Sequence, residues 1–93
     1  MRILFVVRGP QETSTAFDVA ERMTRRGHDV VFMFAQEGAQ HASEEETVAL
    51  LSYVEGVNCL GSECPNRVGG VTALDYAGWV GLLEDCDRIV SWG

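Results

Sequence analysis

The chain has no lysine, and its apolar runs are short. All 7 basic residues are arginines, against 14 acidic residues, which gives a formal net charge of −7 over 93 residues. A protein that binds nucleic acid needs a basic face, so nucleic acid is not expected as a partner. No apolar run approaches the ~20 residues that cross a bilayer, so no membrane partner is expected. The N-terminal run is also too short for a secretory signal, which favours a cytoplasmic protein.

Several common catalytic and nucleotide-binding motifs are missing. The sequence has no G-x-G-x-x-G or G-x-x-x-x-G-K-[ST] loop to hold a phosphate, and no G-x-S-x-G elbow. Nucleotide chemistry and serine hydrolysis therefore have no support, and no cofactor is predicted. The 3 cysteines are an odd number, which disfavours a disulfide scaffold. A reducing compartment with a free or reactive thiol is the preferred interpretation.

Apolar runs of strand length alternate with segments of helical spacing. This alternation, in a chain of one-domain size, predicts a single domain over 1–93 with an α/β fold. The expected architecture is a three-layer α/β/α sandwich with a mostly parallel sheet of four or five strands. We expect strands at 2–7, 29–34, 57–60 and 87–92, and helices at 15–26, from Ser43 to about 55, and from Thr72 onward.

Possible capping residues mark the start of each predicted helix. Thr13, Ser14 or Thr15 can cap the first helix, and Gly27 suits its end. S/T-x-x-D/E spacings can satisfy the free amides of a first turn; they occur at Thr15 with Asp18, Ser43 with Glu46, and Thr72 with Asp75.

Three predicted loops, 8–14, 35–42 and 61–71, follow strands and should meet where ligands bind in parallel sheets. In the third predicted helix, Gly78 and Gly81 cost about a kcal/mol each relative to alanine, which suggests close approach of another backbone or subunit. With Trp79 and Trp92 and an exposed sheet edge, this favours an oligomer.

Residues 56–70 hold two of the three cysteines, one of the two prolines and four of the ten glycines. Within this stretch, Cys64 is the first candidate for chemistry, because a thiolate is favoured by a nearby cation or a helix N-terminus. Arg67 supplies the cation, whereas Glu63 opposes the thiolate. The alternative interpretation is a half-buried loop cysteine with no role.

Cys59 is the second candidate, five positions before Cys64. It could resolve a sulfenic acid or a persulfide on Cys64 by forming a disulfide, or pair with Cys64 as a metal ligand. The C-x4-C spacing differs from that of structural zinc sites, and His28 and His41 are far apart in the sequence. Cys86 is most simply a small buried hydrophobic residue.

The order of these segments resembles the DsrE/DsrF/DsrH-like sulfur-relay family. The resemblance covers nearly the whole chain, and its first half runs from the strand at 3–7 through a loop with proline to the second strand and Glu37-Gly38. Family members have a G-V-x…C-G-x-x-C-type loop followed by Arg and Gly, and a final D-x-V-[VL]-[ST]-[FW] strand. The matching residues here are Gly56-Val57, Cys64, Arg67, Gly69 or Gly70, and residues 87–92.

The resemblance implies a three-layer α/β fold that assembles into a homo-oligomer, a trimer or a hexamer. It also implies that Cys64 carries sulfane sulfur as a persulfide between a sulfur donor protein and a sulfur acceptor protein. Our hypothesis is therefore a sulfur carrier, transferase-like if active, with Cys64, Arg67 and Cys59 as site residues. The alternative is a non-catalytic oligomeric binding module of the same fold. No metal site is predicted.

Overall fold

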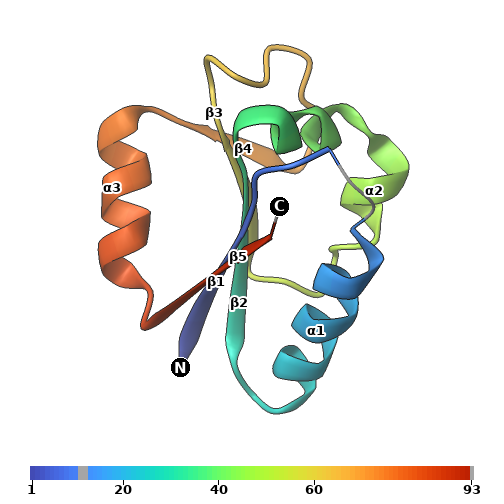
Figure 1. Cartoon of the computed structure of the whole chain (residues 1–93), viewed down its shortest axis with the longest axis vertical. Coiled ribbons are helices and arrows are strands. Elements are labelled where there is room, and N and C mark those ends of the chain that lie inside the picture. Colours follow the sequence, from blue (N-terminus) through green and yellow to red (C-terminus); the bar gives the residue numbers. More distant parts are fainter. Residues whose placement is uncertain (11–12, 93) are drawn as a thin grey trace.

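The computed structural model describes residues 1–10 and 13–92, and in them five strands form one all-parallel sheet (Figure 1). Along the chain the elements are β1 (Arg2–Val7), α1 (Ser14–Arg25), β2 (Asp29–Phe34), the 3-10 helix η1 (Gln36–Ser43), α2 (Glu45–Ala49), β3 (Gly56–Leu60), β4 (Val71–Leu74), α3 (Tyr76–Asp85) and β5 (Arg88–Trp92). Across the sheet the strand order is β4-β3-β2-β1-β5. Because α1, η1 and α2 cover one face and α3 covers the other, the predicted three-layer sandwich is confirmed.

Strands β1 and β2 lie inside the sheet and are buried on both faces. Residues 3–7 and 30–34 are each at most 5 % exposed, and Phe5 and Phe32 are partners in the parallel register. Successive side chains of a strand point to opposite faces of the sheet. Each of these two strands therefore contributes side chains to two apolar clusters, one on each face. This explains why both strands read as continuous apolar runs rather than as alternating ones.

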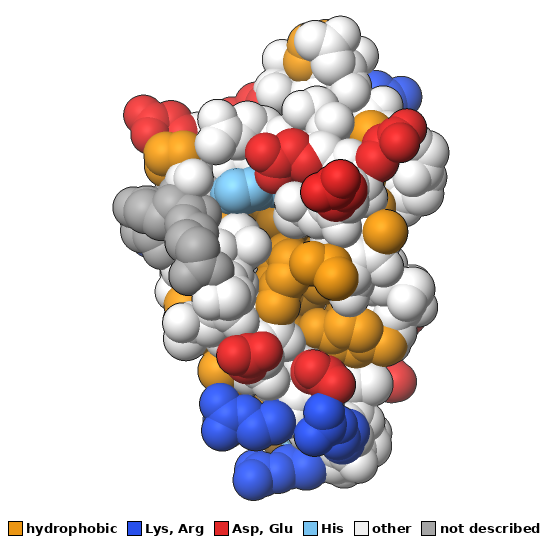
Figure 2. All heavy atoms as spheres, turned by 90° about the vertical axis from the view of Figure 1, so that its right-hand side faces the viewer, with side chains coloured by type: hydrophobic (Ala, Val, Ile, Leu, Met, Phe, Trp, Pro, Cys, Tyr) orange, Lys and Arg blue, Asp and Glu red, His pale blue; other side chains and the backbone are white. Residues whose placement is uncertain are grey.

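The cluster under α1 and α2 is centred on aromatic rings. The ring of Phe32, which is 0 % exposed, has its centroid 5.4 Å from those of Phe5 and Phe17 and 6.1 Å from that of Phe34. Phe17 comes from α1, so this helix is fixed to the sheet through the ring contacts. Figure 2 looks onto the outer surface of this side, where hydrophobic side chains are visible between charged groups.

The cluster under α3 is less fully covered. Its buried residues come from β1, β2 and the residue that follows β2, whereas α3 contributes only partly buried side chains. Tyr76, at the start of α3, is 75 % exposed. No helix among the described residues has the length and apolar character to cross a membrane.

The first predicted helix is confirmed to within one residue at each end. It spans Ser14–Arg25, and Thr13 is its N-cap residue, although no side chain accepts a hydrogen bond there. The expected capping box of Thr15 with Asp18 is wrong, because Thr15 already lies inside the helix. Gly27 follows with φ of +88°, the left-handed conformation that favours glycine after a helix.

The segment expected as a polar loop at 35–42 is instead η1, and it is partly buried. A Cβ on Gly38 would overlap the carbonyl oxygen of Val7, so only glycine allows η1 to pack on the end of β1. The long helix predicted from Ser43 is also wrong, because α2 spans only Glu45–Ala49. The Ser43 hydroxyl donates to the carbonyl of Gln40 and completes η1, leaving the amides of the next helix uncapped by it.

The helix predicted from Thr72 starts later than expected. Residues Val71–Leu74 form β4, an edge strand parallel to β3, and α3 begins only at Tyr76. Asp75 is the cap of this helix, since its carboxylate accepts a hydrogen bond of 2.7 Å from the amide of Gly78. The T-x-x-D spacing was therefore a misleading signal, and the β-branched pair at 71–72 indicated the strand.

Candidate functional site at the carboxyl end of strand β3

The described parts of all three predicted loops lie at the carboxyl ends of strands. Residues 8–10 follow β1, η1 follows β2, and residues 61–70 follow β3. All five strands are parallel, so these segments share one edge of the sheet, the edge at which such folds bind ligands. Residues 11–12 of the first loop lie outside the described residues.

The segment 61–70, here called the cysteine loop, is held against η1 at two points. The Glu63 carboxylate accepts a hydrogen bond of 3.1 Å from the amide of Gln36, at the start of η1. The amide of Val68 donates to the carbonyl of Ala42, near the end of η1, over 2.8 Å. These contacts fix both halves of the cysteine loop to a single neighbouring element. Glu63 is thus oriented by a backbone amide.

The two cysteines of this region are bonded to each other. Cys59 lies in β3 beside Phe34 of β2 and is 0 % exposed, whereas Cys64 lies in the cysteine loop and is 4 % exposed. A turn closed by the Glu63 amide on the Leu60 carbonyl returns the chain, so that the two Cα atoms are 6.5 Å apart and the sulfurs form a disulfide. The sequence favoured a free or reactive thiol and left a disulfide as one possible role of the pair, so the preferred interpretation is wrong for these two cysteines in this structure. It also did not predict that both sulfurs would be buried.

The backbone, rather than the guanidinium, links Arg67 to Cys64. The Arg67 amide donates to the Cys64 carbonyl over 3.3 Å, while its side chain is exposed and makes no ion pair within residues 1–10 and 13–92. The Cys64 sulfur lies 3.0 Å from the Leu60 carbonyl oxygen, to which it can donate a hydrogen bond when it is a thiol.

A histidine of η1 pairs with the carboxylate of the residue that directly follows this helix. The Nδ1 atom of His41 is 2.9 Å from an Oε1 of Glu44 that also accepts a hydrogen bond from the Thr47 hydroxyl. The hydrogen bond with His41 lowers the pKa of Glu44, with a smaller contribution from Thr47. His41 is 6 % exposed and its Nε2 atom is buried without a partner among the described residues. The His-x-x-Glu spacing in the sequence was the signal for this pair, which sequence reasoning missed.

Cys86 lies apart from these residues, between α3 and β5. It is a free thiol and is partly rather than fully buried, packing against the cluster under α3. Burial raises the pKa of the Cys86 thiol, so it is a poor nucleophile at neutral pH. Within the described part of the chain, no three His, Cys, Asp or Glu side chains are placed to hold a metal ion.

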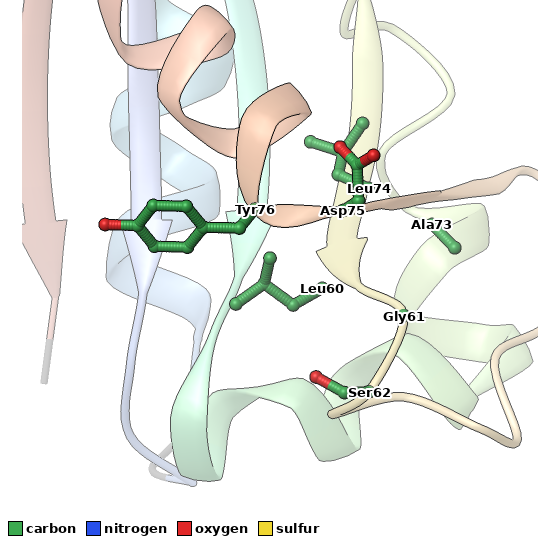
Figure 3. Close-up of a pocket in the computed structure, with 7 residues that line it drawn as sticks. All are labelled: Leu60, Gly61, Ser62, Ala73, Leu74, Asp75 and Tyr76. Atoms are coloured by element: carbon green, nitrogen blue, oxygen red, sulfur yellow. The ribbon is translucent and has the colours of Figure 1, made fainter.

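A cavity of about 550 Å³ opens at the carboxyl ends of β3 and β4 (Figure 3). Its lining is mainly apolar, and Ser62, Asp75 and Tyr76 are the lining residues with polar side chains. The phenol of Tyr76 points away from the other lining residues (Figure 3). Ser62 belongs to the cysteine loop, and Asp75 is already bound to the first turn of α3. The cavity therefore lies next to the cysteine loop, on the α3 side of the sheet, whereas both bonded sulfurs belong to the cluster on the α1 side.

Comparison with known proteins identifies the fold. No family model and no curated protein sequence matches the chain. Among solved structures, the crystal structure of the YchN protein from E. coli superposes with a TM-score of 0.73 at 9 % sequence identity, covering 99 % of this chain and 100 % of that one. The chain has the fold of YchN. YchN has a DsrE/DsrF-like fold, so the fold implied by the resemblance is confirmed.

Proposed function

We propose that this chain is a small sulfur-relay protein in which Cys64 carries sulfane sulfur as a persulfide. The observation that carries the proposal is the Cys59–Cys64 pair at the carboxyl end of β3, in a chain with a DsrE-like fold. A donor and an acceptor protein in the cytoplasm, and a homo-oligomeric state of three or six copies, belong to the same proposal. No cofactor takes part.

The transfer of sulfur to Cys64 and from Cys64 to an acceptor requires no group of this chain other than its thiols. The Cys64 thiolate attacks the outer sulfur of a donor persulfide, and the donor thiolate leaves. An acceptor thiolate then attacks the outer sulfur on Cys64 and regenerates the Cys64 thiolate. When no acceptor is present, the Cys59 thiolate attacks the inner sulfur, expels hydrosulfide and leaves the Cys59–Cys64 disulfide. A dithiol reductant returns this disulfide to two thiols and is itself oxidised.

In this cycle the disulfide-bonded form is the state that does not accept sulfur. Cys64 is 4 % exposed when bonded, so a donor protein reaches it only after reduction and opening of the cysteine loop. The hydrogen bonds that then still join the cysteine loop to other elements include those of Gly61 with Leu74, Glu63 with Gln36, and Val68 with Ala42. The exposed Arg67 moves with this loop, and its role is to favour the anionic persulfide once Cys64 is in solvent.

Sulfur loading can be tested by mass spectrometry on the intact protein. The chain is reduced, freed of reductant, incubated with a low-molecular-weight hydropersulfide and weighed. Wild type should gain the mass of one sulfur atom, and Cys59→Ser should retain that sulfur longer because the resolving thiol is gone. Cys86→Ser is the matched control and should load like wild type. If Cys64→Ser gains sulfur as readily as wild type, the proposal is wrong.

The burial of both sulfurs favours a second candidate, a non-catalytic oligomeric binding module with a structural disulfide. In this case Cys59 and Cys64 only pin the cysteine loop to β3. Helix α3 supports the oligomer in either case, since it is largely apolar yet has no buried residue. This candidate predicts no sulfur loading by the reduced protein, together with a defined multimer in light scattering.

A further inference from the structure

The cavity at the carboxyl ends of β3 and β4 has no part in the proposed sulfur transfer. Its volume of about 550 Å³ is within the usual range of small-molecule sites in proteins. Two segments form its walls: residues 60–62 at the end of β3, and residues 73–76, which join β4 to α3 (Figure 3). Both lie at the edge of the parallel sheet where ligands bind in such folds. The cavity is therefore a candidate ligand site.

Hydrogen bonds within the chain hold the two walls of the cavity in place. The Gly61 amide donates to the Leu74 carbonyl over 3.0 Å, which joins one wall to the other. The first wall also lies within the short loop that the disulfide closes, where the Glu63 amide donates to the Leu60 carbonyl over 2.9 Å. A ligand that enters a site with fixed walls orders little of the protein, so less of its binding free energy is lost.

The start of α3 at this cavity does not offer the anion site that a helix N-terminus can form. Asp75 is the N-cap residue, and its Oδ1 atom accepts a hydrogen bond of 2.7 Å from the amide of Gly78. The carboxylate thus occupies a free amide of the first turn with the chain's own negative charge. The formal net charge of the chain is −7. A phosphate or a carboxylate would therefore be repelled here.

The charge of Asp75 is not balanced by a cation of the chain. Among the described residues that line the cavity none is basic, and Asp75 forms no ion pair within residues 1–10 and 13–92. Its Oδ2 atom also accepts no hydrogen bond from these residues. One carboxylate oxygen is therefore available to a cationic hydrogen-bond donor.

The rest of the lining suits an apolar group. Leu60 and Leu74 are partly buried and pack against the cluster under α3, so part of their surface remains open to the cavity. Gly61 and Ala73 add no polar side chain, and they leave space between the walls. An apolar group placed here would cover exposed apolar surface and remove it from water, which favours binding.

We propose that this cavity binds a small primary amine with an apolar body. The ammonium group pairs with the Asp75 carboxylate, and the apolar body packs against Leu60 and Leu74. The inference goes beyond the sulfur-relay proposal and does not depend on it, because the bonded sulfurs belong to the cluster on the other face of the sheet.

Four probes test the charge and the apolar body separately: phenethylamine, phenethyl alcohol, phenylpropionate and ethylamine. Each is titrated into the oxidised protein, and the shifts of amide resonances at 60–62 and 73–76 are followed by NMR. Phenethylamine should bind about fivefold or more tightly than phenylpropionate, with the alcohol between them, because the ion pair is exposed and worth little more. Ethylamine has the charge without the ring and should give no saturable shift.

Asp75→Asn separates the charge of this residue from its role as helix cap, because Asn caps a helix as well as Asp does. The variant should stay folded by circular dichroism and bind phenethylamine about threefold more weakly, while its affinity for phenethyl alcohol stays unchanged. The matched control is Glu84→Gln, which removes one exposed carboxylate from α3 outside the cavity. It should bind all four probes like wild type.

Several results would overturn the proposal. These are equal binding of the amine and phenylpropionate, saturable binding of ethylamine at the same affinity, or equal losses of amine binding in Asp75→Asn and Glu84→Gln. Shifts spread over the whole sheet would mean nonspecific association. Shifts of the lining amides that follow protein concentration without any probe would mean that a second copy of the chain covers the cavity. Sulfur loading by Cys64 is measured separately, and its failure would not alter these outcomes.

Discussion

The two faces of the sheet are covered to different degrees. On the α1 side, helix and sheet side chains form one cluster in which Phe17, Ala20 and Leu51 are each at most 8 % exposed. On the α3 side a single helix covers the sheet and buries none of its own residues completely. The first face is completed within the chain, whereas the second leaves apolar helix surface available to other molecules. Stability should therefore depend mainly on the first face.

A matched pair of leucines tests this difference most strongly. Leu51→Ala removes a side chain that is 2 % exposed on the α1 side, and should lower the free energy of unfolding by about 2–5 kcal/mol. Leu83→Ala on α3 removes a partly buried side chain and should cost about half as much. Urea unfolding measures both. Equal costs would mean that α3 is covered in solution, and unfolding that depends on protein concentration would identify a second copy as the cover.

Two glycines test the backbone of the same two regions. Gly38→Ala should destabilise by about 3 kcal/mol, because the new methyl group meets the Val7 carbonyl and the end of β1 must move. Gly81→Ala meets nothing within 4 Å and should stabilise α3 by about 1 kcal/mol. Thermal or urea unfolding measures both changes. A destabilising Gly81→Ala would instead point to a close contact with another copy at this position.

The sequence predicted the strands of the sheet interior because their signal is local. The runs at 2–7 and 29–34 are apolar after their first residue, which is the pattern of a strand covered on both faces, and both strands are confirmed. Strand β4 was missed because an edge strand of four residues carries little periodicity and Thr72 with Asp75 imitated a helix start. Its identity as a strand depends on pairing with β3, a tertiary contact that no local pattern shows.

The candidate site was predictable only in part, for a similar reason. The position of Cys64 after the third strand was visible in the sequence, and so was its possible pairing with Cys59. The burial of both sulfurs was not, because it depends on η1, which the sequence presented as a polar loop. His41 was judged as an isolated residue, although its partner Glu44 lies only one helical turn away.

Reduction of the disulfide should loosen the α1 side near η1 and leave the α3 side unchanged. The bond closes a short loop, so its removal should lower the free energy of unfolding by about 2 kcal/mol. Amide exchange locates the effect: the Val68 amide, bonded to Ala42, should exchange faster in the reduced protein. The Trp79 amide in α3, bonded to Asp75, is the reference and should keep its rate. Equal acceleration of both amides would mean that the disulfide supports the whole fold rather than the cysteine loop.

The smallest expected effect is a loss of stability in acid that begins on the α1 side. The hydrogen bond with His41 lowers the pKa of Glu44 below its ordinary value of 4.5, so the folded chain binds a proton there less readily than the unfolded chain does. This contribution is fully present above pH 4.5 and disappears as the pH falls through the lower, folded pKa. It should be small, because Glu44 is exposed and solvent screens its charge.

Glu44→Gln should remove this acid dependence, and Glu45→Gln should leave it, since the Glu45 carboxylate has no hydrogen-bond partner among the described residues. Urea midpoints measured from neutral pH down past 4.5 give the comparison. The amide of Val48, which donates to the Glu44 carbonyl, should report the loosening before any amide of α3 does. An acid transition that starts in α3 would contradict this prediction. It would show that the half-covered α3 side, rather than the His41–Glu44 pair, determines the pH at which the fold is lost in acid.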